Sequence, residues 1–190
     1  MLFAGFVTGV VAVYLVAVEH IINWPIGLAN VAIYAVSFYN GKLFADSSLQ
    51  IFYFVLGVQG WYLWARGGEN KESLKISRTP DKWWPRVAVA AVVGVAVYVR
   101  IILHFKGPVP YYMVDCVLTV GSIVAQLLLN AKKIENWIFW IAVDIAYLPL
   151  FYAKGYYSTV ILYAIYLVLA IIGLVGWLKT YRQESGITAA

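Results

Sequence analysis

The chain has 190 residues, of which 63% are hydrophobic and only 12% charged, and its mean hydropathy is +0.80. Soluble domains carry about 25% charged residues, so half that share cannot cover a water-facing surface of this size. The composition therefore excludes an ordinary soluble enzyme and a disordered chain. Cys116 is the single cysteine, which also excludes a secreted fold held together by disulfides. The net charge is +5, and the positions of the basic residues along the chain carry more information than the total.

Seven apolar stretches follow one another, separated by charges, prolines and glycines. They span residues 2–18, 24–40, 48–65, 87–105, 109–129, 136–152 and 155–178. Most have the roughly 17–25 residues that a helix needs to cross a hydrocarbon core of about 30 Å, and they lack the alternation of a membrane barrel. No basic residue precedes the first stretch, so we expect a retained span rather than a signal peptide. The sequence predicts an all-α membrane protein with seven transmembrane helices.

Basic residues divide the connections between the predicted helices into two sets. Four of them lie in one set, namely Lys42, Arg100, Lys106 and Lys154. Ten lie in the other set, namely Arg66, Lys71, Lys75, Arg78, Lys82, Arg86, Lys132, Lys133, Lys179 and Arg182. The positive-inside rule places the richer set in the cytoplasm, with the amino terminus outside and the carboxyl terminus inside. Because residues 66–86 also hold acidic side chains, we interpret them as a cytoplasmic linker and not as a nucleic-acid patch.

A faint internal repeat relates residues 23–61 to residues 136–177. Each copy opens with Asn-Trp, continues with Phe-Tyr and a turn glycine (Gly41 or Gly155), and ends with Gly-Trp at Gly60-Trp61 or Gly176-Trp177. The repeat predicts a 3+1+3 arrangement of two parallel three-helix bundles. Its parts are a first bundle at 1–65, the linker at 66–86, a connecting helix at 87–105, a second bundle at 106–178 and a cytoplasmic tail at 179–190. Parallel repeats are typical of transporters, whose substrates bind between the halves near the midplane.

Two acidic residues fall within the predicted spans, and ionisable groups in hydrocarbon are usually functional. Asp115 is close to the outer interface, whereas Asp144 lies in the middle of the sixth span. Trp137 and Trp140 share one helical face with Asp144, at positions i, i+3 and i+7. Indole rings beside a carboxylate suit a flat, preferably cationic, aromatic ligand. The alternative is that the two tryptophans only pack against the seventh helix.

Amides and hydroxyls within the spans form a second group of candidate binding residues. They are Asn30, Tyr34, Gln50, Tyr53 and Gln126, with Gln59 and Ser122 nearby in the same helices. Such groups suit a polyhydroxylated moiety such as ribose, but they could equally join neighbouring helices. The chain lacks the sequence motifs of metalloproteases, phosphate loops, redox dithiols and serine hydrolases, so we expect no enzyme and no cofactor.

Several stretches resemble the bacterial PnuC-type nicotinamide riboside transporters. They are N-W-P-I-G-L-A-N, L-F-A-D-S-S-L-Q-I-F-Y and G-W-Y-L-W within residues 23–64, A-Q-L-L-L-N-A-K-K-I-E-N-W-I-F-W-I-A-V-D at 125–144 and K-G-Y-Y-S-T-V-I-L-Y at 154–163. The most specific is the E-N-W-x-x-W-x-x-x-D run, and the resemblance covers nearly the whole chain.

The resemblance implies a fold similar to the SWEET sugar carriers, a homotrimer in the bacterial inner membrane and facilitated diffusion. It also implies that a cytoplasmic riboside kinase traps the ligand by phosphorylation, and that Trp137 and Trp140 line the vitamin site. Relatives that carry thiamine or riboflavin keep another flat vitamin open as the substrate. A membrane-embedded enzyme or a structural protein is the remote alternative.

Overall fold

The computed structural model describes residues 2–40, 44–105, 107–108 and 110–186, and its regular elements are seven α-helices and two short 3-10 turns. They are α1 (Leu2–Ala17), α2 (Asn23–Asn40), α3 (Phe44–Arg66), η1 (Glu69–Lys71), η2 (Asp81–Trp83), α4 (Trp84–Phe105), α5 (Tyr112–Asn130), α6 (Glu135–Ala153) and α7 (Tyr157–Glu184). The predicted all-α fold with seven helices is confirmed. Gly41, Lys42, Lys106 and Val109 lie outside the described residues.

Four helix boundaries differ by three residues or more from those expected from hydropathy. The third helix begins at Phe44 instead of 48, α4 begins at Trp84 instead of 87, α5 begins at Tyr112 instead of 109, and α7 continues to Glu184 instead of ending at 178. Hydropathy marks the part of a helix that lies in hydrocarbon, while the backbone hydrogen bonds can continue beyond it. Pro85 is tolerated because it stands in the first turn of α4, where the missing N–H has no partner in the helix.

Length and composition qualify four of these helices as membrane spans among the residues that the structure describes. They are α4 with η2 in front of it (Asp81–Phe105), α5, α6 and α7, while Gly5–Ala17 in α1 is a shorter apolar segment. The helices α2 and α3 are 18 and 23 residues long. Polar side chains such as Asn30 and Gln50 interrupt them, and both of these face the interior cavity described below.

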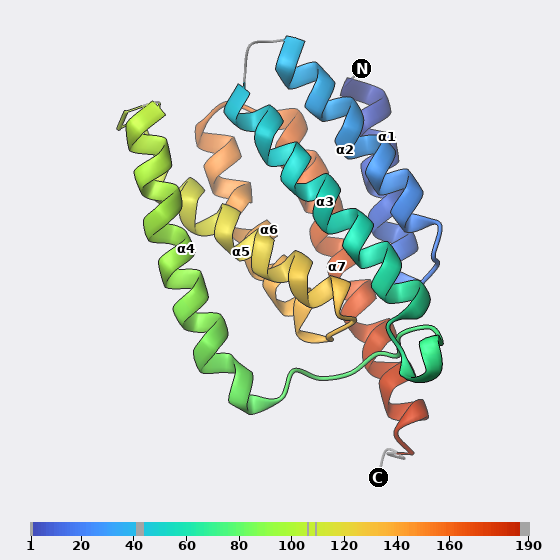
Figure 1. The fold of residues 1–190 in the computed structure, drawn as a ribbon. Coiled ribbons are helices and arrows are strands. Elements are labelled where there is room, and N and C mark those ends of the chain that lie inside the picture. Colours follow the sequence, from blue (N-terminus) through green and yellow to red (C-terminus); the bar gives the residue numbers. More distant parts are fainter. Residues whose placement is uncertain (1, 41–43, 106, 109, 187–190) are drawn as a thin grey trace.

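Six of the helices form a bundle, and α4 stands at its edge (Figure 1). Neighbours in the chain pack together within α1–α2–α3 and within α5–α6–α7. Contacts of α1 with α7 and of α3 with α5 join these two groups, whereas α4 packs mainly against α5. No residue of α4 is buried, so most of its apolar surface is left to lipid. The two termini lie at opposite ends of the bundle (Figure 1).

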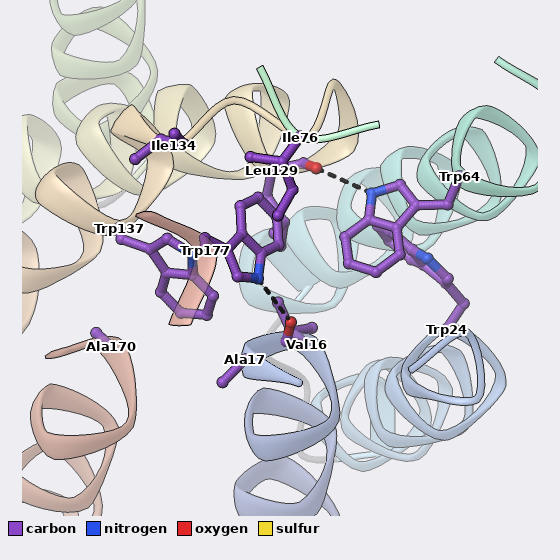
Figure 2. Close-up of a cluster of buried hydrophobic side chains, with 10 residues drawn as sticks. All are labelled: Val16, Ala17, Trp24, Trp64, Ile76, Leu129, Ile134, Trp137, Ala170 and Trp177. Atoms are coloured by element: carbon purple, nitrogen blue, oxygen red, sulfur yellow. Dashed lines mark hydrogen bonds between the residues drawn. The ribbon is translucent and has the colours of Figure 1, made fainter. Parts of the chain in front are cut away.

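A cluster of tryptophans forms the hydrophobic core (Figure 2). Trp24 packs edge-on against Trp64 at 5.3 Å between ring centroids, and Trp137 packs edge-on against Trp177 at 5.4 Å. The indole N–H of Trp64 donates to the carbonyl of Leu129 at 3.0 Å. The indole N–H of Trp177 donates to the carbonyl of Val16 at 3.3 Å. Each bond joins one group of three helices to the other, so the cluster fixes how the two groups meet.

The linker between α3 and α4 is tied to the turn between α5 and α6. Ser77 exchanges two backbone hydrogen bonds with this turn, donating to Lys132 and accepting from Ile134, each at 3.0 Å. Thr79 donates its backbone N–H and its hydroxyl to the Glu135 carboxylate at 3.0 and 2.9 Å. These hydrogen bonds hold the linker against this end of the bundle.

Candidate functional site

An interior cavity of about 480 Å³ lies among the helices α1, α2, α3, α5, α6 and α7. Eight of the residues singled out from the sequence contribute to its wall, and they are Asn30, Tyr34, Gln50, Tyr53, Gln126, Trp137, Trp140 and Asp144. The fold thus brings together eight side chains from four helices that the sequence presents as separate candidates. That they bind a ligand stays a prediction.

One face of α6 supplies the carboxylate of the wall. Trp140, Asp144 and Tyr147 follow one another at i, i+4 and i+7, which keeps them on the same side of the helix. Asp144 is 3% exposed. Among the described residues its carboxylate has no hydrogen bond and no ion pair. A carboxylate in this position is available to a ligand, and it favours a positive charge or a hydrogen-bond donor.

Tyrosines that the sequence analysis missed supply much of the remaining wall. Tyr147, Tyr163 and Tyr166 line the cavity together with the expected Tyr34 and Tyr53. The rings of Tyr147 and Tyr163 lie 5.0 Å apart, and those of Tyr163 and Tyr166 lie 5.8 Å apart. The available signal was the spacing of Tyr147 three residues after Asp144 and of Tyr163 three residues before Tyr166.

Two glycines of α1 make room for these rings. A Cβ atom on Gly5 would collide with the ring of Tyr34, and one on Gly9 would collide with the hydroxyl of Tyr166. The small residues therefore let α2 and α7 approach α1 closely, as at other membrane helix contacts. The result is an aromatic enclosure large enough for a flat ring.

Trp137 lines the cavity together with Trp140, as the sequence motif predicts. Its side chain is only 1% exposed, however, so most of its ring is packed in the core. Its indole fills the space over Gly173, where a Cβ would collide with it, and it packs against Trp177. Trp137 thus closes the cavity wall mainly as a core residue, whereas Trp140 is half-buried and faces the cavity.

Asp115, the second acidic residue within the spans, lies outside the lining of the cavity. Its carboxylate accepts a hydrogen bond from the Lys154 ammonium at 2.6 Å. This ion pair joins the start of α5 to the turn between α6 and α7. It gives Asp115 a structural role near the expected membrane boundary.

The electrostatic character of the cavity is that of an acidic site. Among the described lining residues there is no lysine, arginine or histidine, and Asp144 is the one carboxylate. With five tyrosines and Trp140 around it, the site can accommodate an aromatic cation by stacking and by charge pairing.

Comparison with known proteins places the chain in a family. A sequence model described as nicotinamide mononucleotide transporter matches residues 1–179. The nicotinamide riboside transporter PnuC of Neisseria mucosa is 31% identical over 192 residues, which cover 95% of this chain and 72% of the relative. PnuC of Escherichia coli is 27% identical over 204 residues, with 95% and 85% covered.

Two further matches bear on fold and ligand. The riboflavin/roseoflavin transporter RibM of Streptomyces davaonensis is 29% identical over 170 residues, covering 86% of this chain and 77% of that protein. The crystal structure of the vitamin B3 transporter PnuC superposes with a TM-score of 0.75 at 28% identity, covering 95% of this chain and 81% of that one. These relatives are multi-pass membrane transporters, not enzymes. The chain therefore belongs to the nicotinamide mononucleotide transporter family, the PnuC-type transporters that its sequence motifs resemble.

Proposed function

We propose that this protein carries nicotinamide riboside across the bacterial inner membrane by facilitated diffusion. The observation that carries the proposal is the cavity in which Trp140 and the unpaired Asp144 carboxylate face the same space. Nicotinamide riboside has a flat pyridinium ring with a fixed positive charge, and a ring of this kind suits both groups. Relatives named for this substrate match nearly the whole chain.

The chemistry of the wall favours the riboside over its phosphorylated form. A phosphate group needs cationic side chains or a ring of backbone N–H donors. The described lining residues include no cation, and Asp144 would repel a phosphate. We therefore infer that the mononucleotide in the family's description is not the cargo of this chain.

Riboflavin is the second candidate, because RibM matches 86% of this chain. Its isoalloxazine ring is flat and could stack in the same aromatic enclosure. It is neutral, however, and would leave the Asp144 carboxylate without a counter-charge. The buried carboxylate therefore supports the cationic riboside.

We also propose the 3+1+3 repeat, with α4 as the connecting helix. Support comes from a constant offset between equivalent residues, since 137 − 24, 173 − 60 and 177 − 64 all equal 113. In each copy a Cβ atom on the glycine would collide with the ring of the buried tryptophan, and a second tryptophan forms a T-shaped contact with that ring. This register replaces the Gly-Trp match of the sequence analysis, which paired Gly60 with Gly176.

The same offset pairs the contacts that join the two halves. Trp64 in the first half donates to Leu129 in the second, and Trp177 in the second half donates to Val16 in the first. The repeat relates these two hydrogen bonds, because Trp64 is equivalent to Trp177 and Val16 is equivalent to Leu129. Glu19 and Lys132 are themselves equivalent, and their side chains form an ion pair at 3.0 Å. Such reciprocal contacts favour alternating access, in which the halves rock about the cavity and these contacts close one end.

The orientation, the assembly and the trapping step complete the proposal. The distribution of lysine and arginine supports an amino terminus outside and a carboxyl terminus in the cytoplasm, which places the Glu19–Lys132 pair on the cytoplasmic side. The test is to fuse to the carboxyl terminus a reporter enzyme that is active only in the periplasm. Activity of this fusion would contradict the proposed orientation. The resemblance to PnuC-type transporters supports a homotrimer and trapping of the riboside by a cytoplasmic kinase.

The decisive experiment is a binding titration of the purified protein with nicotinamide riboside, thiamine and riboflavin. We expect the riboside to bind tightest by at least about tenfold, or about 1.4 kcal/mol. Tighter binding of riboflavin would assign the cavity to that vitamin instead. Nicotinamide mononucleotide serves as the control ligand and should not compete.

Transport is tested with labelled riboside in proteoliposomes. The chain has little intramembrane charge beyond Asp115 and Asp144, so it lacks the relay that proton-coupled carriers use. We expect the internal concentration to reach the external concentration and then stop. Accumulation above that level that collapses with the ion gradients would contradict facilitated diffusion.

A further inference from the structure

The amide of Gln126 has a defined orientation in the cavity wall, because its neighbour Asn130 is fixed by a backbone group. The carbonyl of Leu56 can only accept a hydrogen bond, so the Asn130 atom 2.8 Å from it must be Nδ2. The Oδ1 of Asn130 then faces Gln126, and the Gln126 atom 2.9 Å away must be the donor Nε2. The Oε1 of Gln126 is thereby left for the cavity.

Asn130 cannot easily turn over and reverse this arrangement. Its side chain is 1% exposed, and its Oδ1 lies against Gly60, where an added Cβ would stand 2.7 Å from it. A reversed amide would place two carbonyl oxygens against each other at Leu56, which costs the desolvation of both. The carbonyl of Leu56 in α3 therefore fixes the orientation of the buried Asn130 amide, and Asn130 in turn fixes the orientation of Gln126.

A second amide of the cavity wall, on α2, is also held with its NH₂ group bonded to the protein. The Nδ2 of Asn30 donates to the carbonyl of Gly5 at 2.9 Å and to the hydroxyl of Thr8 at 2.7 Å. The Ser122 hydroxyl also gives its proton to the protein, donating to the carbonyl of Leu118 at 2.9 Å. With Asp144, four polar side chains of the wall thus offer acceptor oxygens to a ligand.

We propose that Asn130 is a positioning residue that turns Gln126 into a hydrogen-bond acceptor, so that the cavity selects ligands by the donors they carry. The proposal rests on the proposed function, because it assigns the donors to the carboxamide N–H groups or the ribose hydroxyls of nicotinamide riboside. A site built for donors rejects an analogue that lacks them, since its buried acceptors would remain without partners.

The test compares nicotinamide riboside with two analogues. Nicotinic acid riboside replaces the carboxamide donor by a carboxylate, and the tri-O-methyl riboside keeps every oxygen but lacks the hydroxyl protons. We expect the wild-type protein to prefer the parent ligand over at least one analogue by about a hundredfold in Kd. In Asn130→Leu, Gln126 can turn its NH₂ group inward, and we expect that preference to fall by about tenfold.

The matched control is Gln59→Met. Gln59 also contacts Asn130, at 3.4 Å, but it lies outside the cavity lining, so the preference should stay at the wild-type value. The ratio of two dissociation constants does not depend on the folded fraction of the sample. A purely structural role of Asn130 would lower the melting temperature and leave both ratios unchanged, which would overturn the proposal.

A second variant covers the case in which Asn130→Leu does not fold. Gln126→Met keeps the length of a half-buried side chain and removes its oxygen, so the preference should fall as in Asn130→Leu. Unchanged ratios for both analogues would again overturn the proposal. If the wild-type protein fails to bind nicotinamide riboside at all, the proposed function is wrong, and this outcome is distinct from binding without discrimination.

Discussion

Trp140 and Asp144 lie one turn apart on α6, and each contributes a different interaction to the proposed site. The indole offers a polarisable face to a ring, and the carboxylate offers a charge that the described residues leave unpaired. Both effects are stronger at a buried position than in bulk water, and the Asp144 side chain is buried, while Trp140 is half-buried. Substitutions at the two positions therefore separate stacking from charge.

The first prediction concerns stacking on Trp140. A cation over a desolvated indole contributes about 2 kcal/mol, so Trp140→Ala should weaken riboside binding by about thirtyfold in a titration. Trp140→Phe should cost less, since a smaller π-face remains. The control is Trp83→Ala, because Trp83 is 46% exposed and lies outside the cavity. A lower melting temperature with unchanged Kd in Trp140→Ala would make this residue part of the core only.

The second prediction concerns the charge of Asp144. Asp144→Asn keeps the shape and removes the carboxylate, so binding of the cationic riboside should weaken by at least about tenfold. Binding of neutral riboflavin, measured in the same titration, should change little. Equal losses for both vitamins would indicate that the carboxylate supports the fold of the site and does not recognise charge.

At the scale of the helices, the close packing of α6 on α7 depends on one glycine. Gly173 lies directly beneath the indole of Trp137, and a Cβ there would collide with three ring atoms. Gly176, one turn further along α7, has only the carbonyl of Ala17 near it, at 3.7 Å from an added Cβ. The two glycines of one helix therefore have different structural roles.

The third prediction follows from this contrast. Gly173→Ala should lower the stability by about 1–3 kcal/mol through overpacking, seen as a reduced melting temperature of the detergent-solubilised protein. Gly176→Ala is the matched control and should be neutral or slightly stabilising, because alanine favours the helix. Equal melting temperatures for the two variants would contradict the close contact between Gly173 and Trp137.

The whole molecule is held at one end by contacts that join its two groups of helices. Lys132 pairs with Glu19 at 3.0 Å and lies 4.6 Å from the ring centre of Trp64. The Lys132 side chain is 10% exposed and the Glu19 side chain 25%, so water screens the pair only in part. Opening this end of the cavity in the proposed cycle requires the ion pair to break.

The fourth prediction tests that requirement. In a Cys116→Ser background, Ala12→Cys places a thiol in the cavity wall. Adding Glu19→Gln removes an interaction of about 1 kcal/mol and should raise labelling by an impermeant maleimide from the carboxyl-terminal side about fivefold. The exchanged pair Glu19→Lys with Lys132→Glu should return labelling towards the starting rate. Unchanged labelling in Glu19→Gln would show that the pair does not hold this end closed.

The sequence alone determined the membrane class, the seven helices and the shared face of Trp140 and Asp144. These follow from hydropathy and from the helical period, which act over one or two turns of a single helix. The sequence did not predict the start of α3 at Phe44 or the end of α7 at Glu184, because hydropathy reports the surrounding solvent and not the extent of backbone hydrogen bonding.

Only the tertiary structure decided what depends on distances between helices. The burial of Trp137 against Gly173, the entry of Tyr163 and Tyr166 into the cavity and the orientation of Gln126 all require atoms from separate helices. The match between the dipeptides Gly60-Trp61 and Gly176-Trp177 could not show that Gly173, and not Gly176, contacts the ring of Trp137. Side-chain contacts of this kind are set by packing across the bundle, where a shift of one helical turn exchanges one neighbour for another.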